Sequence, residues 1–502
     1  MKKPPAALAF DLGASSGRAL VGELVTGENG LQQLRITEIH RFVNEPVEVG
    51  PHLHWDILML LKELKTGILK ARQQGFEPAS FGIDTWGVDF GLLDRNGELL
   101  ANPYHYRDPH TTGLIEEVCG LIGEDKLFRK SGLQLMPFNT IYQLYAMKKA
   151  GSVALEHAET LLLTPDLLNY FLTGQKACEF TMATTTQLFR PAERAWNTPL
   201  MERLGIPSDL FLDPVHPGTE IGRLTDAICE ELGVPSMRAI TVGSHDTESA
   251  AAAVPSDSAS FAYLICGTWS LLGTELPDAL LTPEVRELEF SNEGGVGHTF
   301  QLLKNIMGLW ILQECRRKWI KTGSDISFAE LTKEAGNAEA FRSLINPDDL
   351  RFMNPKDMEL EIHRFCQETD QPVPRDKGET ARCILESLAL RYHIVLEQCE
   401  RLTGRHFSGL HMVGGGIQNE LLCQLTANAI GRPVWAGPVE ASAIGNLLVQ
   451  FQAGGEIGSI EEGKELVKRS FPLQSYEPAE ADKWQEAIAR YNGLVNKPNE
   501  IA

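Results

Sequence analysis

Glycine and hydroxyl side chains gather in two short turns, half a chain apart, and each turn follows an apolar, strand-like run. The first turn is Gly13-Ala14-Ser15-Ser16-Gly17, and the second is Gly267-Thr268-Trp269-Ser270. Glycine lets the backbone turn sharply and approach a ligand closely. Consecutive backbone N–H groups and hydroxyls in such a turn form a concave anion site. Two copies predict a duplicated domain that grips one polyphosphate from both sides.

A carboxylate, Asp11, stands at the end of the strand before the first turn. Such a carboxylate can hold Mg²⁺, usually through water, against phosphate oxygens. The alternative is an aspartate that hydrogen-bonds its own loop. The second turn carries no such carboxylate, so we expect it to supply hydrogen-bond donors alone.

A second aspartate, Asp246, lies in a run of small residues close to the expected domain boundary. At the mouth of a cleft, a carboxylate can accept the proton of a substrate hydroxyl as that oxygen attacks phosphorus. The alternative is an N-cap for a helix over 249–254. His245 beside it suits a hydrogen bond to substrate or a place in the core. Asp84 and Asp89 either face a sugar or line a hairpin.

Three other patterns bear on function. Residues 13–17 also match G-x-S-x-G of serine hydrolases, but that motif needs a helix directly after the serine, and a β-like run follows here. No P-loop, H-E-x-x-H or other compact metal-ligand motif occurs. Residues 293–297 are predicted to form a loop. Residues 414–416, between a strand and a helix, are predicted to accept a nucleotide.

The elements around these residues indicate mixed sheets covered by helices. In the first half, we expect a strand at 19–25, a helix at 58–71, and one strand at 81–93 that turns at Asn96-Gly97 into a hairpin. The stripe expected to be buried on the first helix is Leu58, Leu61, Leu64 and Ile68. In the second half, the expected elements are helices at 384–399, 418–430 and 440–452 and strands at 410–413 and 434–436.

Composition excludes several classes of protein. With 502 residues, 43% of them hydrophobic, the chain is expected to form two or three globular domains. Its net charge of −21 argues against nucleic-acid binding. Nine cysteines occur singly, which favours a reduced, cytoplasmic setting. Cys366 and Cys383 bracket a short loop, and free thiols are expected there. No apolar run suits export or a membrane span.

The motifs taken together resemble the sugar kinases of the FGGY family, within the actin, Hsp70 and hexokinase superfamily. The resemblance covers about residues 7 to 450. It rests on the segments 11–18, 83–90, 137–140, 183–188, 244–247, 267–271, 303–310, 413–416 and 437–442. It implies an α/β protein of two RNase H-like domains, 1–245 and 246–502, with mixed sheets flanked by helices and the nucleotide in the interdomain cleft.

The resemblance also implies roles for single residues. Asp246 matches the catalytic base, and Asp11 matches the carboxylate near Mg²⁺. The positions that match ATP-binding residues are Gly13, Ala14, Ser15, Ser16, Gly17, Arg18, Thr268, Gln313 and Gly415. The positions that match substrate-binding residues are Gly87, His245, Asp246, Thr247 and Asn305.

Departures from the family pattern narrow the substrate. Gly13-Ala14 stands where many members have Gly-Thr, and Ile141-Tyr142-Gln143 stands where many have a Lys and a Trp. Both differences suit the branch that phosphorylates L-rhamnulose at its 1-hydroxyl. His110 stands where an Arg is more usual.

Two alternatives stay open at this point. One is a kinase for another ketose or polyol, such as L-fuculose or L-xylulose, and the other is an actin- or Hsp70-like ATPase. The expected partners are ATP and a ketose, without nucleic acid or membrane, for a monomer or small homo-oligomer.

Overall fold

The chain forms two compact units, each assembled from separate stretches of sequence. The computed structural model describes residues 3–28, 30–258 and 260–495. The first unit comprises residues 1–255, 275–302 and 440–471, and the second comprises 256–274, 303–439 and 472–502. The predicted division at residues 245/246 concerns the family domains and stays a prediction.

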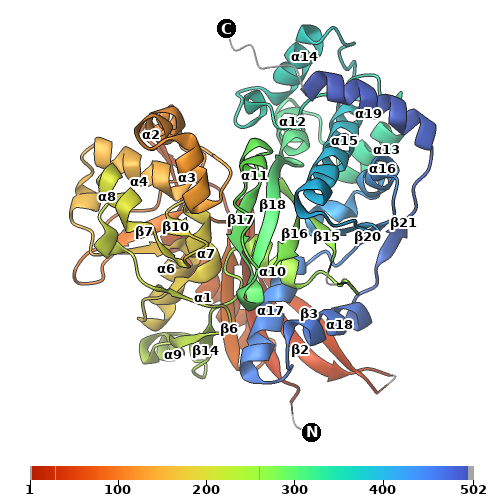
Figure 1. The fold of residues 1–502 in the computed structure, drawn as a ribbon. Coiled ribbons are helices and arrows are strands. Elements are labelled where there is room, and N and C mark those ends of the chain that lie inside the picture. Colours follow the sequence, from red (N-terminus) through yellow and green to blue (C-terminus); the bar gives the residue numbers. More distant parts are fainter. Residues whose placement is uncertain (1–2, 29, 259, 496–502) are drawn as a thin grey trace. The chain divides into compact units, whose positions relative to one another are not determined.

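A six-stranded mixed sheet forms the centre of the first unit (Figure 1). Its order is β13 (Glu220–Arg223), β14 (Arg238–Ile240), β6 (Ser80–Thr85), β1 (Ala6–Leu12), β2 (Ser16–Thr26) and β3 (Gln32–Val43). Strand β1 pairs antiparallel with β2 and parallel with β6. The first turn therefore joins the two central strands β1 and β2.

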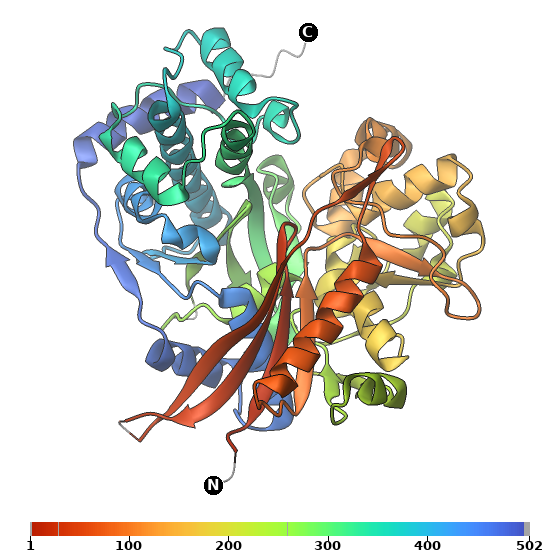
Figure 2. The same ribbon diagram turned by 180° about the vertical axis from the view of Figure 1, so that it is seen from behind.

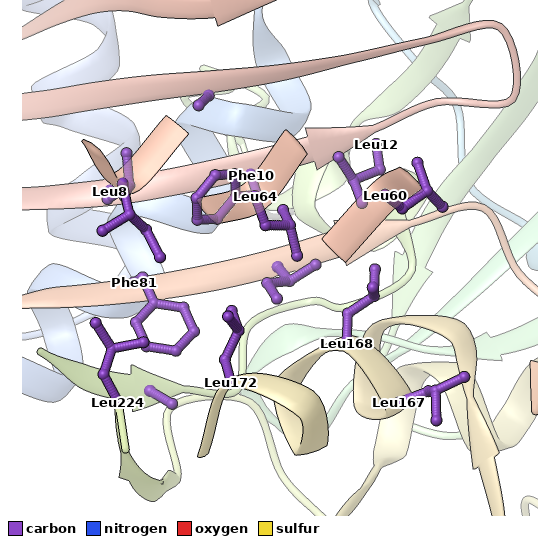
Figure 3. Packing of buried hydrophobic residues seen from close by; sticks show 14 of the residues in the cluster. Leu8, Phe10, Leu12, Leu60, Leu64, Phe81, Leu167, Leu168, Leu172 and Leu224 are labelled. Atoms are coloured by element: carbon purple, nitrogen blue, oxygen red, sulfur yellow. The ribbon is translucent and has the colours of Figure 1, made fainter. Parts of the chain in front are cut away.

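One face of this sheet packs on helices α1 (Ile57–Gln73) and α6 (Thr164–Thr173). Leu8, Phe10 and Leu12 alternate along β1 and meet Leu60 and Leu64 of α1 (Figure 3). Figure 2 shows the long strands β2 and β3 with α1 lying against the same sheet.

The stripe predicted for α1 was wrong in part. The buried side chains include Ile57, Leu60, Leu64 and Ile68, whereas Leu58 is 59% exposed. Leucines occur at several neighbouring positions at the start of this helix, so the sequence allows more than one apolar stripe. The sheet covers the stripe that contains Ile57 and Leu60.

The other face of the sheet carries small residues and receives α17 (Ala441–Gly454) and α10 (Asp246–Ala252). A Cβ added at Gly22 would lie 2.6 Å from Leu447, and one added at Gly82 would lie 2.7 Å from Asn446. The absence of side chains at these glycines allows α17 to approach the strands closely. Asp11 and Asp84 lie on the strands of this sheet.

The single strand predicted over 81–93 is two strands in different sheets, β6 and β7 (Phe90–Leu93). Strand β7 pairs with β8 (Thr160–Leu163), and the predicted hairpin return amounts to one bridge between Leu93 and Leu99. Val88, with φ of 69°, makes the break between the strands. The pattern of apolar residues in the sequence could not reveal this turn, because apolar residues occur in the runs on both sides of Val88.

The second unit repeats the strand directions of the first. Strand β15 (Ala262–Cys266) pairs antiparallel with β16 (Trp269–Leu276) and parallel with β19 (Leu410–Val413). Strand β19 pairs parallel with β20 (Val434–Ala436), which pairs antiparallel with β21 (Gln474–Tyr476). In the first unit, β1, β2, β6, β14 and β13 have the same directions. The predicted pair of mixed sheets flanked by helices is confirmed.

Helices cover the sheet of the second unit (Figure 1). The helices of this unit are α12 (Trp310–Lys321), α13 (Phe328–Asn337), α14 (Met358–Glu368), α15 (Lys377–Thr403), α16 (Glu420–Ile430) and α19 (Ala481–Val495). Helix α16 packs on β20, whereas α13, α14 and α19 pack on other helices of the unit. Helix α15 begins earlier than the predicted 384. All nine cysteines are free thiols, Cys366 and Cys383 included, as expected.

The remaining elements of the first unit surround its sheet and carry some of the functional loops. They are β4 (Val47–Val49), β5 (His52–His54), α2 (Leu114–Ile122), α3 (Glu124–Ser131), α4 (Thr140–Lys149), α5 (Val153–Glu156), β9 (Cys178–Glu179), α7 (Phe180–Thr185), β10 (Phe189–Arg190), β11 (Ala195–Trp196), α8 (Thr198–Leu204), β12 (Pro214–Val215), α9 (Asp226–Leu232), α11 (Pro283–Glu287), β17 (Ser291–Gly294) and α18 (Ile460–Ser470). Strand β18 (Phe300–Met307) continues from the first unit into the second.

Among the residues described, no helix has the length and apolar character needed to cross a membrane.

Candidate active site

The first glycine turn is braced by an asparagine that follows β3. The N–H of Gly13 donates to the carbonyl of Ser16 at 2.9 Å. Asn44 donates from its backbone to Ser15 at 3.1 Å and from its side chain to Gly13 at 2.9 Å. A Cβ at Gly17 would lie 2.2 Å from the ring of Phe42. The turn is thus fixed in shape, while Ser15 is exposed.

Strand β2 begins at Ser16, directly after that exposed serine. A nucleophile elbow needs a helix at this place. The local structure therefore speaks against the serine hydrolase alternative.

Three carboxylates come together at the end of β1 and β6. Asp11 and Asp84 are register partners on these parallel strands, and Thr85 forms a parallel bridge to His245, the neighbour of Asp246. Burial raises the pKa of Asp11, against the opposing charges of Arg18 and Arg41. Burial and the charges of Asp11 and Asp246 raise the pKa of Asp84 well above its ordinary value.

Asp84 is also part of a buried polar ladder that runs to α17. Asn446 donates to its Oδ2 at 2.6 Å, Gln450 donates to Oδ1 of Asn446 at 2.7 Å, and Ser80 donates to Gln450 at 2.8 Å. Within the described part of the chain, Oδ1 of Asp84 has no hydrogen-bond partner, although the residue is fully buried. A buried acceptor of this kind is costly unless a further donor or a cation meets it.

Arg18 links the turn to the start of α17. Its guanidinium lies 3.4 Å from Oδ2 of Asp11 and forms a close ion pair with Glu440. Arg41 is its register partner on β3. The positive charges of both arginines therefore act on Asp11, and that of Arg18 also acts on Asp84.

Asp246 is the first residue of α10, and His245 occupies the N-cap position. The prediction of a helix here is confirmed, but Asp246 is not its N-cap. The carboxylate accepts from the N–H of Thr247 at 2.7 Å, and its side chain remains 30% exposed. Burial raises the pKa of Asp246 to about 6, although the charge of His245 lowers it. An acid with this pKa can serve as a proton acceptor near neutral pH.

The segment around Gly87 has unusual backbone geometry. Val88 is a β-branched residue with positive φ, which is an uncommon and strained conformation. Thr185 accepts from its N–H at 3.2 Å, and Thr140 donates to its carbonyl at 2.6 Å. Strain that is held by hydrogen bonds on both sides is typical of functional sites.

Asp89 lies directly after this strained residue and is fully buried. It accepts hydrogen bonds from Trp55 at 2.6 Å, Trp86 at 3.0 Å, Gln143 at 2.8 Å and the N–H of Tyr106 at 3.2 Å. Burial raises the pKa of Asp89 to about 7, and these donors oppose the rise. The side chain holds the surrounding aromatic groups in place and lies away from solvent.

In the second unit, glycines pack closely around the second turn. A Cβ at Gly308 would lie 2.7 Å from Trp269, and one at Gly416 would lie 2.4 Å from the sulfur of Cys266. A Cβ at Gly415 would meet no described atom within 4 Å. Three of the predicted ATP-binding residues belong to this region, since the hydroxyl of Thr268 lies 3.4 Å from Gln313 and Gly415 follows β19.

The predicted substrate residue Asn305 lies in the second-unit part of β18. The duplicated fold gives an internal comparison for the first site. The register pair that corresponds to Asp11 and Asp84, two residues before the glycine of the turn, is Ile265 and Val413. The second unit therefore lacks the carboxylate pair.

Sequence reasoning missed the partners that hold the site. Asn44, Glu440 and Asn446 come from segments distant in the sequence. Glu293 was assigned to a loop, but it belongs to strand β17 and lies 3.0 Å from His245. Its place in Asn292-Glu293-Gly294-Gly295, a charged residue between an amide and two glycines, was the one available signal.

Comparison with known proteins identifies the family. The sequence model described as "FGGY family of carbohydrate kinases, N-terminal domain" matches residues 6–253, and the corresponding C-terminal domain matches 262–454. The two matched domains define a carbohydrate kinase of two domains. The chain belongs to the FGGY family of carbohydrate kinases. Kinases of this family use ATP as the phosphate donor, typically with a divalent metal ion.

Similar proteins cover almost the whole chain. The rhamnulokinase of Bacteroides thetaiotaomicron is 45% identical over 487 residues, which are 97% of this chain and 99% of that protein. The rhamnulokinase of Halalkalibacterium halodurans is 42% identical over 95% of this chain and 99% of its own. That of Bacillus subtilis is 38% identical over 95% and 96%.

Solved structures share the fold at low sequence identity. Gluconate kinase from Lactobacillus acidophilus has a TM-score of 0.78 at 15% identity, with 98% of both chains covered. Glycerol kinase from Plasmodium falciparum has a TM-score of 0.72 at 14% identity, with 98% of both covered.

Proposed function

We propose that this chain transfers the γ-phosphate of ATP to the 1-hydroxyl of L-rhamnulose, which gives L-rhamnulose 1-phosphate and ADP. The observation that carries the proposal is Asp246, a half-buried carboxylate beside His245 with a pKa raised to about 6. The relatives at 38–45% identity named rhamnulokinase support the choice of sugar.

In the proposed reaction, Asp246 accepts the proton of the 1-hydroxyl as that oxygen attacks the γ-phosphorus. L-Rhamnulose is a 6-deoxy ketohexose, so its 1-hydroxyl is its single primary alcohol. The position of Asp246 at the first turn of α10 supports this role, since Thr247 donates to its Oδ1 and the side chain remains 30% exposed.

We assign ATP to the two glycine turns. Residues 13–17 offer backbone N–H groups and the exposed Ser15, and Arg18 adds a positive charge next to them. In the second unit, Thr268, Gln313 and Gly415 offer hydroxyl, amide and open backbone. Such preorganised donors stabilise the negative charge that develops on the transferred phosphoryl group.

Asp11 is proposed to hold Mg²⁺ through water. The residues present fit a hard cation, because the buried Asp84 next to Asp11 keeps Oδ1 without a hydrogen-bond donor in the described chain. When bound, the ion neutralises phosphate charge. Arg18 and Arg41 limit the net charge of the carboxylates around it.

Gly87, His245, Thr247 and Asn305 are proposed to contact the ketose. The strained Val88 after Gly87 and the buried imidazole of His245 support this assignment in the first unit. The cytoplasmic setting and a monomeric or small homo-oligomeric state stay predictions.

The test is ADP release from ATP with a panel of ketoses and polyols. We expect L-rhamnulose to give the highest kcat/KM. Turnover of L-fuculose, L-xylulose or glycerol far above L-rhamnulose would overturn the sugar assignment and leave the kinase class in place.

A further inference from the structure

The backbone of His245 is fixed from two sides. Its N–H donates to the hydroxyl of Thr181 at 3.1 Å, and the residue forms a parallel bridge with Thr85 at the end of β6. The carbonyl before it, on Ser244, accepts from the N–H of Thr85 at 2.9 Å. What remains free to vary is the rotation of the imidazole.

The imidazole lies between Glu293 and the proposed catalytic base. Its Nδ1 is 3.0 Å from Oε2 of Glu293. Its Nε2 is 3.4 Å from the hydroxyl of Thr247 and 3.6 Å from Oδ1 of Asp246. His245 is 9% exposed and Glu293 is 5% exposed, so water competes little for these contacts. One carboxylate therefore holds the ring by one nitrogen and turns the other nitrogen toward Asp246.

Hydrogen bonds on both sides of Glu293 fix the position of strand β17. On one side of it, the N–H of Asn292 donates to Gly132 at 2.8 Å. On the other side, the N–H of Gly294 donates to the hydroxyl of Thr184 at 2.8 Å. A Cβ at Gly294 would lie 2.4 Å from the ring of Phe180, so glycine lets the strand approach helix α7.

We propose that Glu293 is a positioning residue, which holds His245 by Nδ1 so that Nε2 faces the ketose and the catalytic Asp246. This inference rests on the proposed function, in which His245 contacts the sugar. Nothing in the resemblance or in the relatives assigns a role to Glu293.

The charges around His245 and Glu293 support the proposed role of Glu293. Burial lowers the pKa of His245, but the close contact and charge of Glu293, with the charges of Asp246 and Glu179, outweigh it and raise the pKa. Burial, followed by the charge of Glu293, raises the pKa of Glu248 well above its ordinary value. The ionisable groups that face His245 and Asp246 are Glu293 from β17, Glu179 from β9, Glu248 from α10, Asp11 from β1 and Asp84 from β6. Glu275 of β16 faces Glu248.

The consequence is that the protonated form of His245, beside the base, is favoured up to a higher pH than in a free imidazole. A positive His245 donates from Nε2 to a sugar oxygen and favours the ionised form of Asp246. Without the negative charge of Glu293, His245 loses its proton at lower pH, and Asp246 then gains its proton at higher pH. The pH range in which His245 is protonated and Asp246 is ionised therefore becomes narrower at its acidic and at its basic end.

The direct test is the NMR titration of His245 in the full-length protein with ¹³C-labelled histidine. The resonance is assigned by its absence in His245→Gln. In Glu293→Gln, which keeps the size and removes the charge, we expect the pKa of His245 to fall by about one unit or more. An unchanged pKa in a folded Glu293→Gln protein would overturn the proposal.

Kinetics separate positioning from a merely structural role. We expect Glu293→Gln to lower kcat/KM for the ketose roughly 10–100-fold, with an unchanged KM for ATP and a narrower pH profile. In the His245→Gln background, the same change should cost little more, because Glu293 acts through His245. Equal losses in both backgrounds would show a structural role and contradict the proposal.

A second histidine–glutamate pair gives the matched control. Glu63 lies 2.5 Å from His40 between α1 and β3, and Glu63→Gln should leave the pH profile unchanged. Glu293→Asp keeps the negative charge and should restore in part the acidic and basic limbs of the wild-type pH profile.

A second measurement applies if Glu293→Gln does not fold. The aspartate variant and the titration of His245 in the wild-type protein then decide, and a wild-type His245 pKa below the ordinary value contradicts the proposal. If the protein phosphorylates no ketose, the proposed function is wrong. The titration still tests the contact between Glu293 and His245 by itself.

Discussion

Asp11 and Asp84 are register partners on the parallel strands β1 and β6, so their carboxylates leave the sheet on the same face, about 4.8 Å apart at the backbone. The corresponding pair in the second unit is Ile265 and Val413. The two units therefore share the strand–turn–strand arrangement, whereas the carboxylate pair occurs in the first unit and not at the matching positions of the second.

Removal of the proposed base is the first test of mechanism. Asp246→Asn keeps the size of the side chain and cannot accept a proton, so we expect turnover to fall about 10²–10⁴-fold with ATP binding retained. Asp226→Asn is the matched control, because Asp226 is also the first residue of a seven-residue helix. Turnover of Asp246→Asn at the level of Asp226→Asn would reduce Asp246 to a structural residue.

The pH profile should report the same carboxylate. Burial raises the pKa of Asp246 to about 6, so its protonated fraction grows below that pH and the base is lost. We expect kcat/KM for the sugar to decrease as pH falls through about 6 and, well below it, to drop about tenfold per unit. A profile that stays level to pH 5 would contradict the assignment.

Metal removal should abolish turnover. With EDTA we expect no activity, and with added Mg²⁺ we expect full recovery. Asp11→Asn should raise the Mg²⁺ concentration needed for half-maximal rate roughly 10–100-fold, since its carboxylate is proposed to act through water. An unchanged magnesium requirement in this variant would remove Asp11 from the metal site.

The first turn should tolerate no side chain at Gly17. In Gly17→Ala, the new methyl group would lie 2.2 Å from the tip of the Phe42 ring, so that this ring must turn away or β2 and β3 must shift. We expect a higher KM for ATP and a loss of about 1–3 kcal/mol in the free energy of unfolding. Gly120→Ala in α2 is the control, because no described atom lies within 4 Å of its added Cβ. Equal KM values for ATP in the two variants would contradict a role of the turn in ATP binding.

The ladder from α17 to the sheet should contribute to stability. Asn446→Ala removes the buried donor to Asp84, so we expect the free energy of unfolding to fall by about 1–3 kcal/mol. Gln452→Ala, on the exposed side of the same helix, should have little effect. Urea denaturation of both variants measures the difference, and equal stability would show that Asp84 finds another partner.

Local patterns predicted the parts of the fold that local forces decide. The strand–turn–strand around Gly13 and the helix over 420–430, which ends at Gly431 with positive φ, followed from residue types within a few positions. The run 81–93 misled, because alternating apolar residues continue through the strained turn at Val88.

The rest of the candidate site depends on tertiary contacts between distant segments. Asn446 reaches Asp84 from 362 residues away. Glu293 reaches His245 from a strand whose sequence has the composition of a loop. Residue types could mark Asp11 and Asp246 as acids of interest, but the partners that set their pKa values belong to other parts of the chain.

The central claim is that the γ-phosphate of ATP is transferred to a sugar hydroxyl. ³¹P NMR of the reaction with L-rhamnulose tests this claim most directly. We predict one sugar monophosphate for each ADP, with a proton-coupled triplet because the ester oxygen is on a CH₂ group, and negligible ATP loss without sugar. Equal release of inorganic phosphate with and without L-rhamnulose would contradict the account and indicate an ATPase.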